Sequence, residues 1–523
     1  MTSPPHAARD AEPALARDEQ HWSGVAREPD ETLRTFLPIV DLLREHHGVA
    51  SRVLFHHPPG EWARSELARR SLPIDEVALP AGWLTATSRL QGLARHPPGA
   101  TVDEVSRFWR ARALARSILD TRRPAAVVVI QDTLLLERFL VREANRRGLP
   151  TLVVQWAFSY AQSLYDRLRE VQHGPGAGRD RRGPLGRIAG PLTRRAYRGL
   201  LHSLGLSFDL ANSYGGGEAR LFATMGEAFR EQYLAQGVVE APGRKRVVAT
   251  GHPTHDAVYA RVQALTDDER RAIRRRHGLE GDEPLVLYAT QPVLWRKVIG
   301  RDELATNVRM MADAVARAPG SPRLVLKLHP REHAEDYAFC AALDPPVTVL
   351  PSADVLDLIA ACDAFVSSSS STVLLAMLFD RPIVTVNFNA IPHFDYFEEI
   401  GGTLHVRTPD AFADAIRRAL GDAATRARLA ADRARVIDRY TRFDGRATER
   451  IAGLLLDALA PMQLSGPTSS TPPKPANYHC HPEGAPATEG SHADGLGSER
   501  SLAPLRDDKF VDGSPRTEGA ACS

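Results

Sequence analysis

The sequence predicts an α/β protein of two Rossmann-like domains that face a cleft, with disordered extensions at both ends. Two observations predict this fold class. Short apolar runs alternate with segments of helical periodicity, and this series occurs twice along the chain. A length of 523 residues also exceeds what one hydrophobic core usually supports.

The first series begins with a predicted strand at 51–56. A continuous apolar run at 125–130 is typical of a buried parallel strand. The helix that follows ends at Gly148-Leu149-Pro150, and the whole strand-helix-strand unit should be right-handed. The elements expected here are strands at 51–56, 125–130 and 151–155 and helices at 102–121 and 134–147.

A second series begins near Arg246, where RVVATGHPTHD reads as a strand and a turn. It continues with strands at 284–292, 323–328, 363–366 and 383–386, and with helices at 305–318, 355–361, 373–379, 411–420 and 424–440. The predicted organisation is a disordered segment 1–30, an acceptor domain 31–245, a nucleotide-donor domain 246–460 and a disordered, Pro/Gly/Ser-rich tail 461–523.

Composition excludes several classes of protein. A net charge of +2 gives no global argument for nucleic acid as a partner. The four cysteines form no C-x-x-C pair, and Cys340 and Cys362 look like small core residues of a reducing compartment. We see neither a signal peptide nor a transmembrane run of about 18 apolar residues, so a cytoplasmic location is expected. In the tail, His479, Cys480 and His481 lack the spacing of a zinc site.

The most informative stretch lies between 323 and 389. His329 follows one apolar strand, and the run Ser367 to Thr372 follows another and leads directly into a helix. Open α/β sheets bind ligands at the carboxyl ends of their strands, and helix-start N–H groups attract anions. We therefore expect a phosphate site in which His329 is the catalytic group and the closest hydroxyls are Ser369, Ser370, Ser371 and Thr372.

Neighbouring positions can complete this site. Lys327 precedes the histidine by one strand period and should point to the same side. Thr290 and Gln291 leave the strand at 284–292, and Arg296 follows them, which suggests a second phosphate-facing loop.

Candidates in the first half are fewer. Asp132 ends the strand at 125–130 and can act as the base on an acceptor hydroxyl, or it can cap the next helix. His56 and His57 are rivals for the role of base. Gly251-His252-Pro253 with Asp256 suggests either a hinge or a substrate contact.

The segment between the two series, 179–198, interleaves arginines with apolar residues. It can lie on an anionic membrane surface as a peripheral contact, or it can be a solvated loop and helix.

Several motifs are absent from the sequence. There is no P-loop, no G-x-G-x-x-G after a strand, no G-x-S-x-G and no D-x-D. We therefore expect neither a cofactor nor a metal, and a mechanism in which side chains and helix dipoles stabilise the leaving nucleotide.

The runs TGHPTHD, KLHP and SSSSST followed by AMLFDRPIV resemble the C-terminal half of bacterial GT-B transferases of surface-polymer synthesis. That group includes CDP-glycerol glycerophosphotransferases and capsule sialyl- and Kdo-transferases, and UDP-N-acetylglucosamine 2-epimerases share the half-fold. The likeness covers about residues 245 to 420. It implies that His329 and Ser369 to Thr372 hold the phosphate of a nucleotide-sugar or CDP-polyol donor, with a glycan or lipid-linked acceptor.

Two positions depart from that group. Leu375 stands where many relatives carry a glutamate that binds the donor ribose, and Gln155-Trp156-Ala157 stands where many carry QHG. Three functions therefore stay open: a metal-independent transferase, a hydrolysing UDP-N-acetylhexosamine 2-epimerase, and a non-catalytic nucleotide-binding protein. The sequence does not predict the nucleotide base of the donor, the group that is transferred, the acceptor or the oligomeric state.

Overall fold

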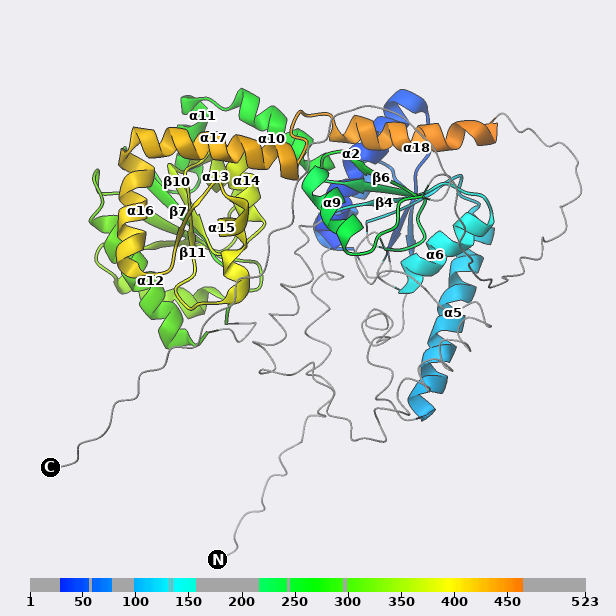
Figure 1. Cartoon of the computed structure of the whole chain (residues 1–523), viewed down its shortest axis with the longest axis horizontal. Coiled ribbons are helices and arrows are strands. Elements are labelled where there is room, and N and C mark those ends of the chain that lie inside the picture. The colour runs from blue at the N-terminus through cyan, green and yellow to red at the C-terminus, as the bar shows by residue number, and fades with distance from the viewer. Residues whose placement is uncertain are drawn as a thin grey trace, which may run out of the picture. The chain divides into compact units, whose positions relative to one another are not determined.

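A computed structural model describes residues 29–55, 59–77, 98–130, 132, 135–156, 216–241, 245–294 and 299–463. The predicted alternation of strands and helices is confirmed, and all of the strands named below pair in parallel (Figure 1). The described residues belong to one compact unit, and the segments predicted to be disordered lie almost entirely outside them.

The larger sheet has six strands in the order β12-β11-β10-β7-β8-β9. From β7 the chain builds outward through β8 and β9, then returns to the other side of β7 for the remaining three strands. This reversal of direction creates a topological switch point between β7 and β10. The bounds are β7 (Leu285–Ala289), β8 (Arg323–Lys327), β9 (Thr348–Leu350), β10 (Ala364–Ser367), β11 (Ile383–Val386) and β12 (Leu404–Val406).

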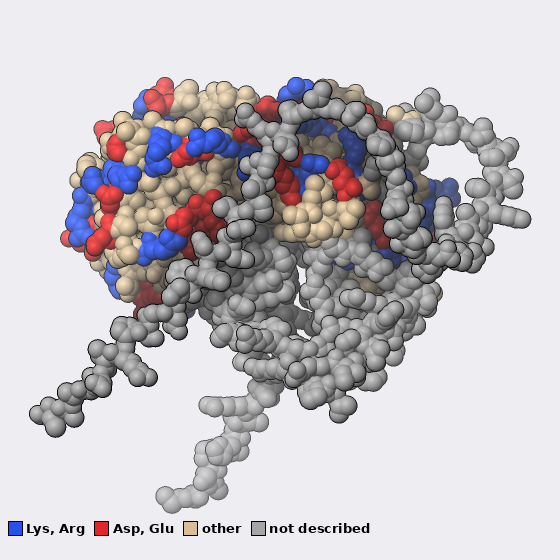
Figure 2. Space-filling model, viewed as in Figure 1, with Lys and Arg blue, Asp and Glu red and all other residues tan. Residues whose placement is uncertain are grey.

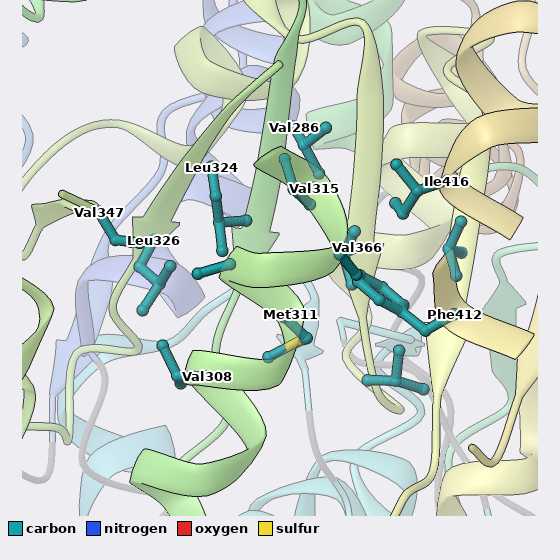
Figure 3. Packing of buried hydrophobic residues seen from close by; sticks show 14 of the residues in the cluster. Val286, Val308, Met311, Val315, Leu324, Leu326, Val347, Val366, Phe412 and Ile416 are labelled. Atoms are coloured by element: carbon teal, nitrogen blue, oxygen red, sulfur yellow. The ribbon is translucent and has the colours of Figure 1, made fainter. Parts of the chain in front are cut away.

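Helices cover both faces of this sheet because its strands are apolar on both sides. On one face, α12 (Arg301–Ala316) and α16 (Pro409–Gly421) pack over the strands. Figure 3 shows Met311 and Val315 of α12 and Ile416 of α16 in this core, beside Val286 and Leu324 of the sheet. The buried core on the other face includes residues of α13 (Val355–Ala361), α14 (Thr372–Leu378) and α17 (Ala423–Tyr440).

The smaller sheet has four strands in the order β3-β4-β5-β6, and β1 pairs with β2 in a separate sheet. The strands are β1 (Val53–Phe55), β2 (Ile74–Glu76), β3 (Val127–Val129), β4 (Thr151–Val154), β5 (Leu221–Thr224) and β6 (Arg246–Ala249). The helices of this part are α2 (Pro29–His47), α3 (Glu61–Arg69), α5 (Pro98–Arg122), α6 (Leu135–Arg146) and α9 (Glu227–Ala235).

One assignment from the sequence is wrong. We expected the strand at Arg246 to open the second series, but β6 pairs with β5 along its whole length and closes the first sheet. Its apolar residues satisfied the pattern of a strand, and pattern alone does not identify the pairing partner. The domain boundaries themselves stay a prediction.

The chain also returns to the first sheet at its end. Ile451, Leu454 and Leu455 of α18 (Ala447–Gln463) share a core with Leu152 of β4 and Leu221 of β5. This return was not expected from the sequence. The remaining elements are α10 (Pro253–Ala264), α11 (Asp267–Arg276), the 3₁₀ segments η2 (Ala334–Ala342) and η3 (Pro392–Asp395), and α15 (Tyr396–Ile400).

Two further observations bear on the expectations from composition. Cys340 and Cys362 are free and buried, as expected for core residues. Within the described segments, no helix combines the length and the apolar character that a bilayer crossing requires.

Candidate functional site

The predicted phosphate-site residues meet at the carboxyl ends of β7, β8 and β10. The backbone N–H of His329, after β8, donates to Thr290 Oγ1, after β7, at 2.9 Å. On the other side of β7, the Ser367 hydroxyl at the end of β10 donates to the Ala289 carbonyl at 2.9 Å. The structure therefore brings three exit loops together at the topological switch point, where ligands of such sheets bind.

His329 is half-buried, and its loop is a tight turn. The turn closes through Glu332 N–H, which donates to the His329 carbonyl at 2.9 Å. The ring Nδ1 accepts from the backbone N–H of Arg331 at 3.1 Å. Because Nδ1 acts as an acceptor, the neutral ring carries its proton on Nε2. That tautomer presents an N–H donor, the group that a phosphate oxygen requires.

The serine run divides into a buried and an accessible part. Ser367, Ser368 and Ser369 are buried, whereas Ser370 and Thr372 are half-buried and Ser371 is exposed. Ser370 Oγ accepts from Thr372 N–H at 3.2 Å, at the start of α14. Thr372 Oγ1 is buried without a hydrogen-bond partner in the described structure. Of the four residues whose hydroxyls the sequence assigned to the ligand, Ser370 and Ser371 are accessible, whereas Ser369 and the Thr372 hydroxyl are buried. Their contacts with a phosphate stay predictions.

Gln291 connects two of the exit loops. When its amide oxygen faces the serine run, it accepts from the backbone N–H groups of Ser369 at 2.9 Å and Ser370 at 2.5 Å. This contact positions the loop after β10 relative to β7. Gln291 and Thr290 already form hydrogen bonds with the loops after β10 and β8. Their role as phosphate ligands stays a prediction.

Lys327 does not present a free ammonium. Its Nζ donates to the carbonyls of Leu328 at 2.5 Å and Pro351 at 3.0 Å, next to β9. Burial lowers the pKa of this lysine, and the nearby Asp354 and Glu332 oppose that shift. Its predicted contact with phosphate also stays a prediction.

Sequence reasoning missed Glu332, which lies three residues after His329. One carboxylate oxygen accepts from His329 N–H at 3.2 Å and from the Thr290 hydroxyl, and the other accepts from Tyr337 OH at 2.8 Å. Burial raises the pKa of Glu332 and of Tyr337. The sequence signal was available in the run HPRE, where a glutamate can reach back to the N–H at the start of the turn.

Asp132 is completely buried in the smaller-sheet part of the chain. Its Oδ2 accepts from Gly217 N–H at 2.6 Å, and its backbone carbonyl accepts from Arg138 Nε at 2.9 Å. Lys245 lies close by and donates to the Gly217 carbonyl at 2.6 Å. These contacts favour a structural role over that of a base, which would need access to an acceptor hydroxyl.

The turn after β6 and the first turn of α10 pack against the start of α18. Gly251 has φ +91°, and a Cβ there would lie 2.8 Å from both Ala447 Cβ and the Arg442 carbonyl oxygen. Asp256 caps α18 by accepting from the N–H groups of Ala447 at 2.9 Å and Thr448 at 2.7 Å. The hinge role and the substrate role considered for this segment both stay predictions.

Some predicted positions lie outside the described residues: Arg296, His56, His57, Ala157 and the basic segment 179–198. Leu375, which replaces a ribose-binding glutamate of many relatives, packs against the core beneath α14. The hydrophobic side chain thus has a packing role at this position.

One cluster has side chains of the types that bind metals. Asp395, Glu398 and His405 have ligand atoms within 4.8 Å of one another. However, Asp395 already accepts from Asn387 at 2.7 Å, and Arg407 forms ion pairs with both carboxylates. Among the described residues, these hydrogen bonds and ion pairs account for the closeness of the three side chains, and no metal is needed to explain it.

Comparison with known proteins gives one family. Residues 240–457 match the family model described as CDP-Glycerol:Poly(glycerophosphate) glycerophosphotransferase. No curated protein matches the chain. The matched segment spans β6 to α18 and so contains His329, Glu332 and the whole serine run.

Solved structures with similar folds include three proteins of different functions. The chain is similar to MnaA of S. aureus with UDP (14% identity, 84% of this chain and 97% of that chain, TM-score 0.47). It is also similar to the glycotransferase of kitacinnamycin (16%, 82% and 96%, 0.49) and the wall teichoic acid polymerase TagF (12%, 83% and 86%, 0.44). At these identities and TM-scores the likeness does not discriminate among functions.

The family match does discriminate among the three functions left open by the sequence. It favours group transfer over the epimerase and the non-catalytic protein. The resemblance inferred from the HP and serine motifs is thereby confirmed for this part of the chain. Residues 240–457 are thus similar to the CDP-glycerol:poly(glycerophosphate) glycerophosphotransferase family.

Proposed function

We propose that this protein transfers a polyol phosphate or a sugar from a nucleotide-activated donor to a glycan or lipid-linked acceptor of the cell surface. The observation that carries the proposal is the position of His329, Ser370 and Ser371 in the loops that follow β8 and β10, the two strands on either side of β7. These residues lie inside the segment that matches the glycerophosphotransferase family. A CDP-polyol is the donor class that the family name favours.

The geometry suggests how the donor is activated. In transfer from a CDP-polyol, the acceptor oxygen attacks the phosphorus that carries the polyol, and the bond to the oxygen of the departing CMP breaks. Negative charge then develops on the leaving phosphate. The Nε2–H of His329 and the hydroxyls of Ser370 and Ser371 are donors that can stabilise this charge, or the histidine can transfer its proton. In sugar transfer the same groups would stabilise a departing nucleoside diphosphate.

The acceptor side has less support. We propose no residue as the base, since Asp132 is enclosed and His56 and His57 lie outside the described residues. A peripheral membrane contact through 179–198, a cytoplasmic location, and a reaction that needs neither metal nor cofactor belong to the same proposal.

Binding of CDP tests the donor site. His329→Ala should weaken CDP about 10- to 100-fold by calorimetry, the equivalent of a charge-assisted hydrogen bond of about 1.5–3 kcal/mol. His333→Ala is the matched control, because His333 is exposed four residues later in the same loop. If His329→Ala binds CDP as the unmodified protein does, the proposed site is wrong.

Product analysis separates transfer from epimerisation. Labelled CDP-glycerol should release CMP only when an acceptor is present, and UDP-N-acetylglucosamine should be returned unchanged. Conversion of UDP-N-acetylglucosamine to a free epimerised sugar would replace the transferase interpretation.

A further inference from the structure

The loop that carries His329 is held by a carboxylate that the sequence did not single out. We propose that Glu332 is a positioning residue which, together with Thr290, fixes the His329 turn in the geometry that binds the donor phosphate. The inference rests on the proposed function and extends it to residues around the binding groups.

The geometry is a three-way junction around one N–H group. His329 N–H is shared between Thr290 Oγ1 at 2.9 Å and Glu332 Oε2 at 3.2 Å. The Thr290 hydroxyl accepts this bond and donates its own proton to the same Glu332 oxygen. The junction therefore ties the exit of β8 to the exit of β7, and it needs an acceptor at Glu332 Oε2.

The carboxylate is positioned from its other end as well. Tyr337, which is buried in η2, donates its hydroxyl to Glu332 Oε1 at 2.8 Å. No ion pair to Glu332 is present within the described ranges, although the charge of Lys327 interacts with it. A carboxylate that forms no ion pair is unfavourable beside a phosphate site. The hydrogen bonds to the turn offset this cost.

The charge environment makes this junction sensitive to pH. Burial and Asp336 raise the pKa of Glu332, while hydrogen bonds from Thr290, Tyr337 and the His329 N–H lower it, and the net pKa is above its usual value. Lys327 lies near enough for its charge to interact, and the half-buried Tyr288 lies near the group. When Glu332 is protonated, its carboxyl becomes a donor and the junction loses an acceptor.

The test measures CDP affinity by calorimetry at pH 8 and pH 5 for the full chain and for Glu332→Gln. At pH 8 the variant should bind CDP about 5- to 20-fold more weakly, because the amide has a single acceptor oxygen. Its NH2 group must face either Tyr337 OH or the pair of donors from Thr290 and His329. At pH 5 the ratio of the two Kd values should fall towards one, since part of the native carboxylate is itself protonated.

Two further variants complete the test. Thr290→Val should weaken CDP in the same direction and Thr290→Ser should restore it, which keeps the proposal testable if Glu332→Gln does not fold. Glu335→Gln, an exposed glutamate in η2, should bind CDP as the unmodified protein does. Thermal unfolding of each variant identifies loss of folding.

The outcomes distinguish the two proposals. If His329→Ala abolishes CDP binding while Glu332→Gln and Thr290→Val bind normally, the donor site stands and the positioning role is wrong. A Kd ratio for Glu332→Gln that is equal at both pH values also overturns the positioning role. If His329→Ala itself leaves CDP binding intact, the donor site is wrong.

Discussion

At the scale of single residues, Asp132 shows how burial decides between two roles. The sequence allowed it to be a base or a cap. In the structure the carboxylate is fully enclosed, and it accepts from Gly217 N–H at 2.6 Å. A Cβ on Gly217 would lie 2.4 Å from the same oxygen, so only glycine permits this approach. The residue therefore stabilises the loop that leads into β5.

Replacing Asp132 should accordingly change stability more than donor binding. Asp132→Ala leaves the Gly217 N–H without its acceptor and removes the negative charge near Lys245, and the free energy of unfolding should fall by about 1–3 kcal/mol. Urea denaturation measures this loss. The interpretation is contradicted if the variant keeps its stability but loses transfer activity, as a catalytic base would.

The sequence predicted where His329 and the serine run lie better than it predicted the contacts of each residue. His329 and the serine run could be placed because the exits of parallel strands meet at one edge. The individual roles could not, because hydrogen bonds across strands are not visible in periodicity. Ser367 donates to a carbonyl of β7, and Lys327 to carbonyls beside β9. Glu332 was missed since its function depends on the shape of a turn.

At the scale of elements, some strands could be predicted and others could not. The apolar runs that form β7, β8 and β11 were found with bounds within a few residues. The three-residue strands β2, β9 and β12 were not predicted, although the equally short β1 and β3 were. The pairing of strands could not be predicted either. β6 was recognised as a strand but assigned to the wrong sheet, because its partner β5 was not predicted.

The start of α18 depends on Asp256, which is distant in sequence. Asp256→Ala removes the acceptor for two N–H groups at the helix start, and stability should fall by about 0.5–2 kcal/mol. Asp256→Asn should recover most of the loss. Asp457→Ala, at an exposed site in the same helix, is the control and should change stability by a few tenths of a kcal/mol. An equal effect of the two alanine variants in urea denaturation would refute the capping role.

At the scale of the whole molecule, opposite charges alternate on the surface in view (Figure 2). Arg428 and Arg435 of α17 both pair with Asp432, for example. Exposed pairs of this kind contribute about 0.2–1 kcal/mol each and are weakened by salt. Stability is therefore set mainly by the buried cores, and its dependence on pH by buried titratable groups.

Two buried histidines near the start of α10 illustrate that dependence. Their ring centroids are 5.0 Å apart, and His255 Nδ1 lies 2.9 Å from Thr441 Oγ1 after α17. Burial lowers the pKa of His255 to about 4, and burial together with His255 holds the pKa of His252 well below its usual value. Both rings are therefore neutral in the folded protein at pH 7.

Acid should destabilise the protein through these rings. Between about pH 6.5 and 4 the unfolded chain binds protons that the folded state does not, so the stabilising contribution is complete above this window and falls as the pH falls through it. For His255 alone the loss from pH 7.5 to pH 5 should be roughly 2 kcal/mol. His255→Gln keeps a polar partner for Thr441 and does not titrate, so its stability should fall less over the same interval. Urea denaturation at both pH values measures the difference, and identical losses would exclude the role of His255.

The return of α18 to the first sheet has a consequence for how the chain can be divided. The smaller-sheet part is discontinuous in sequence, and the larger sheet is inserted into it between β6 and α18. A fragment that ends after β6 would expose the apolar surface on β4 and β5 that Ile451, Leu454 and Leu455 cover. The insert, in contrast, begins and ends at one place, where His255 meets Thr441. It is therefore the insert that can be excised or circularly permuted as a unit, whereas the first half can be isolated only with α18 attached to it.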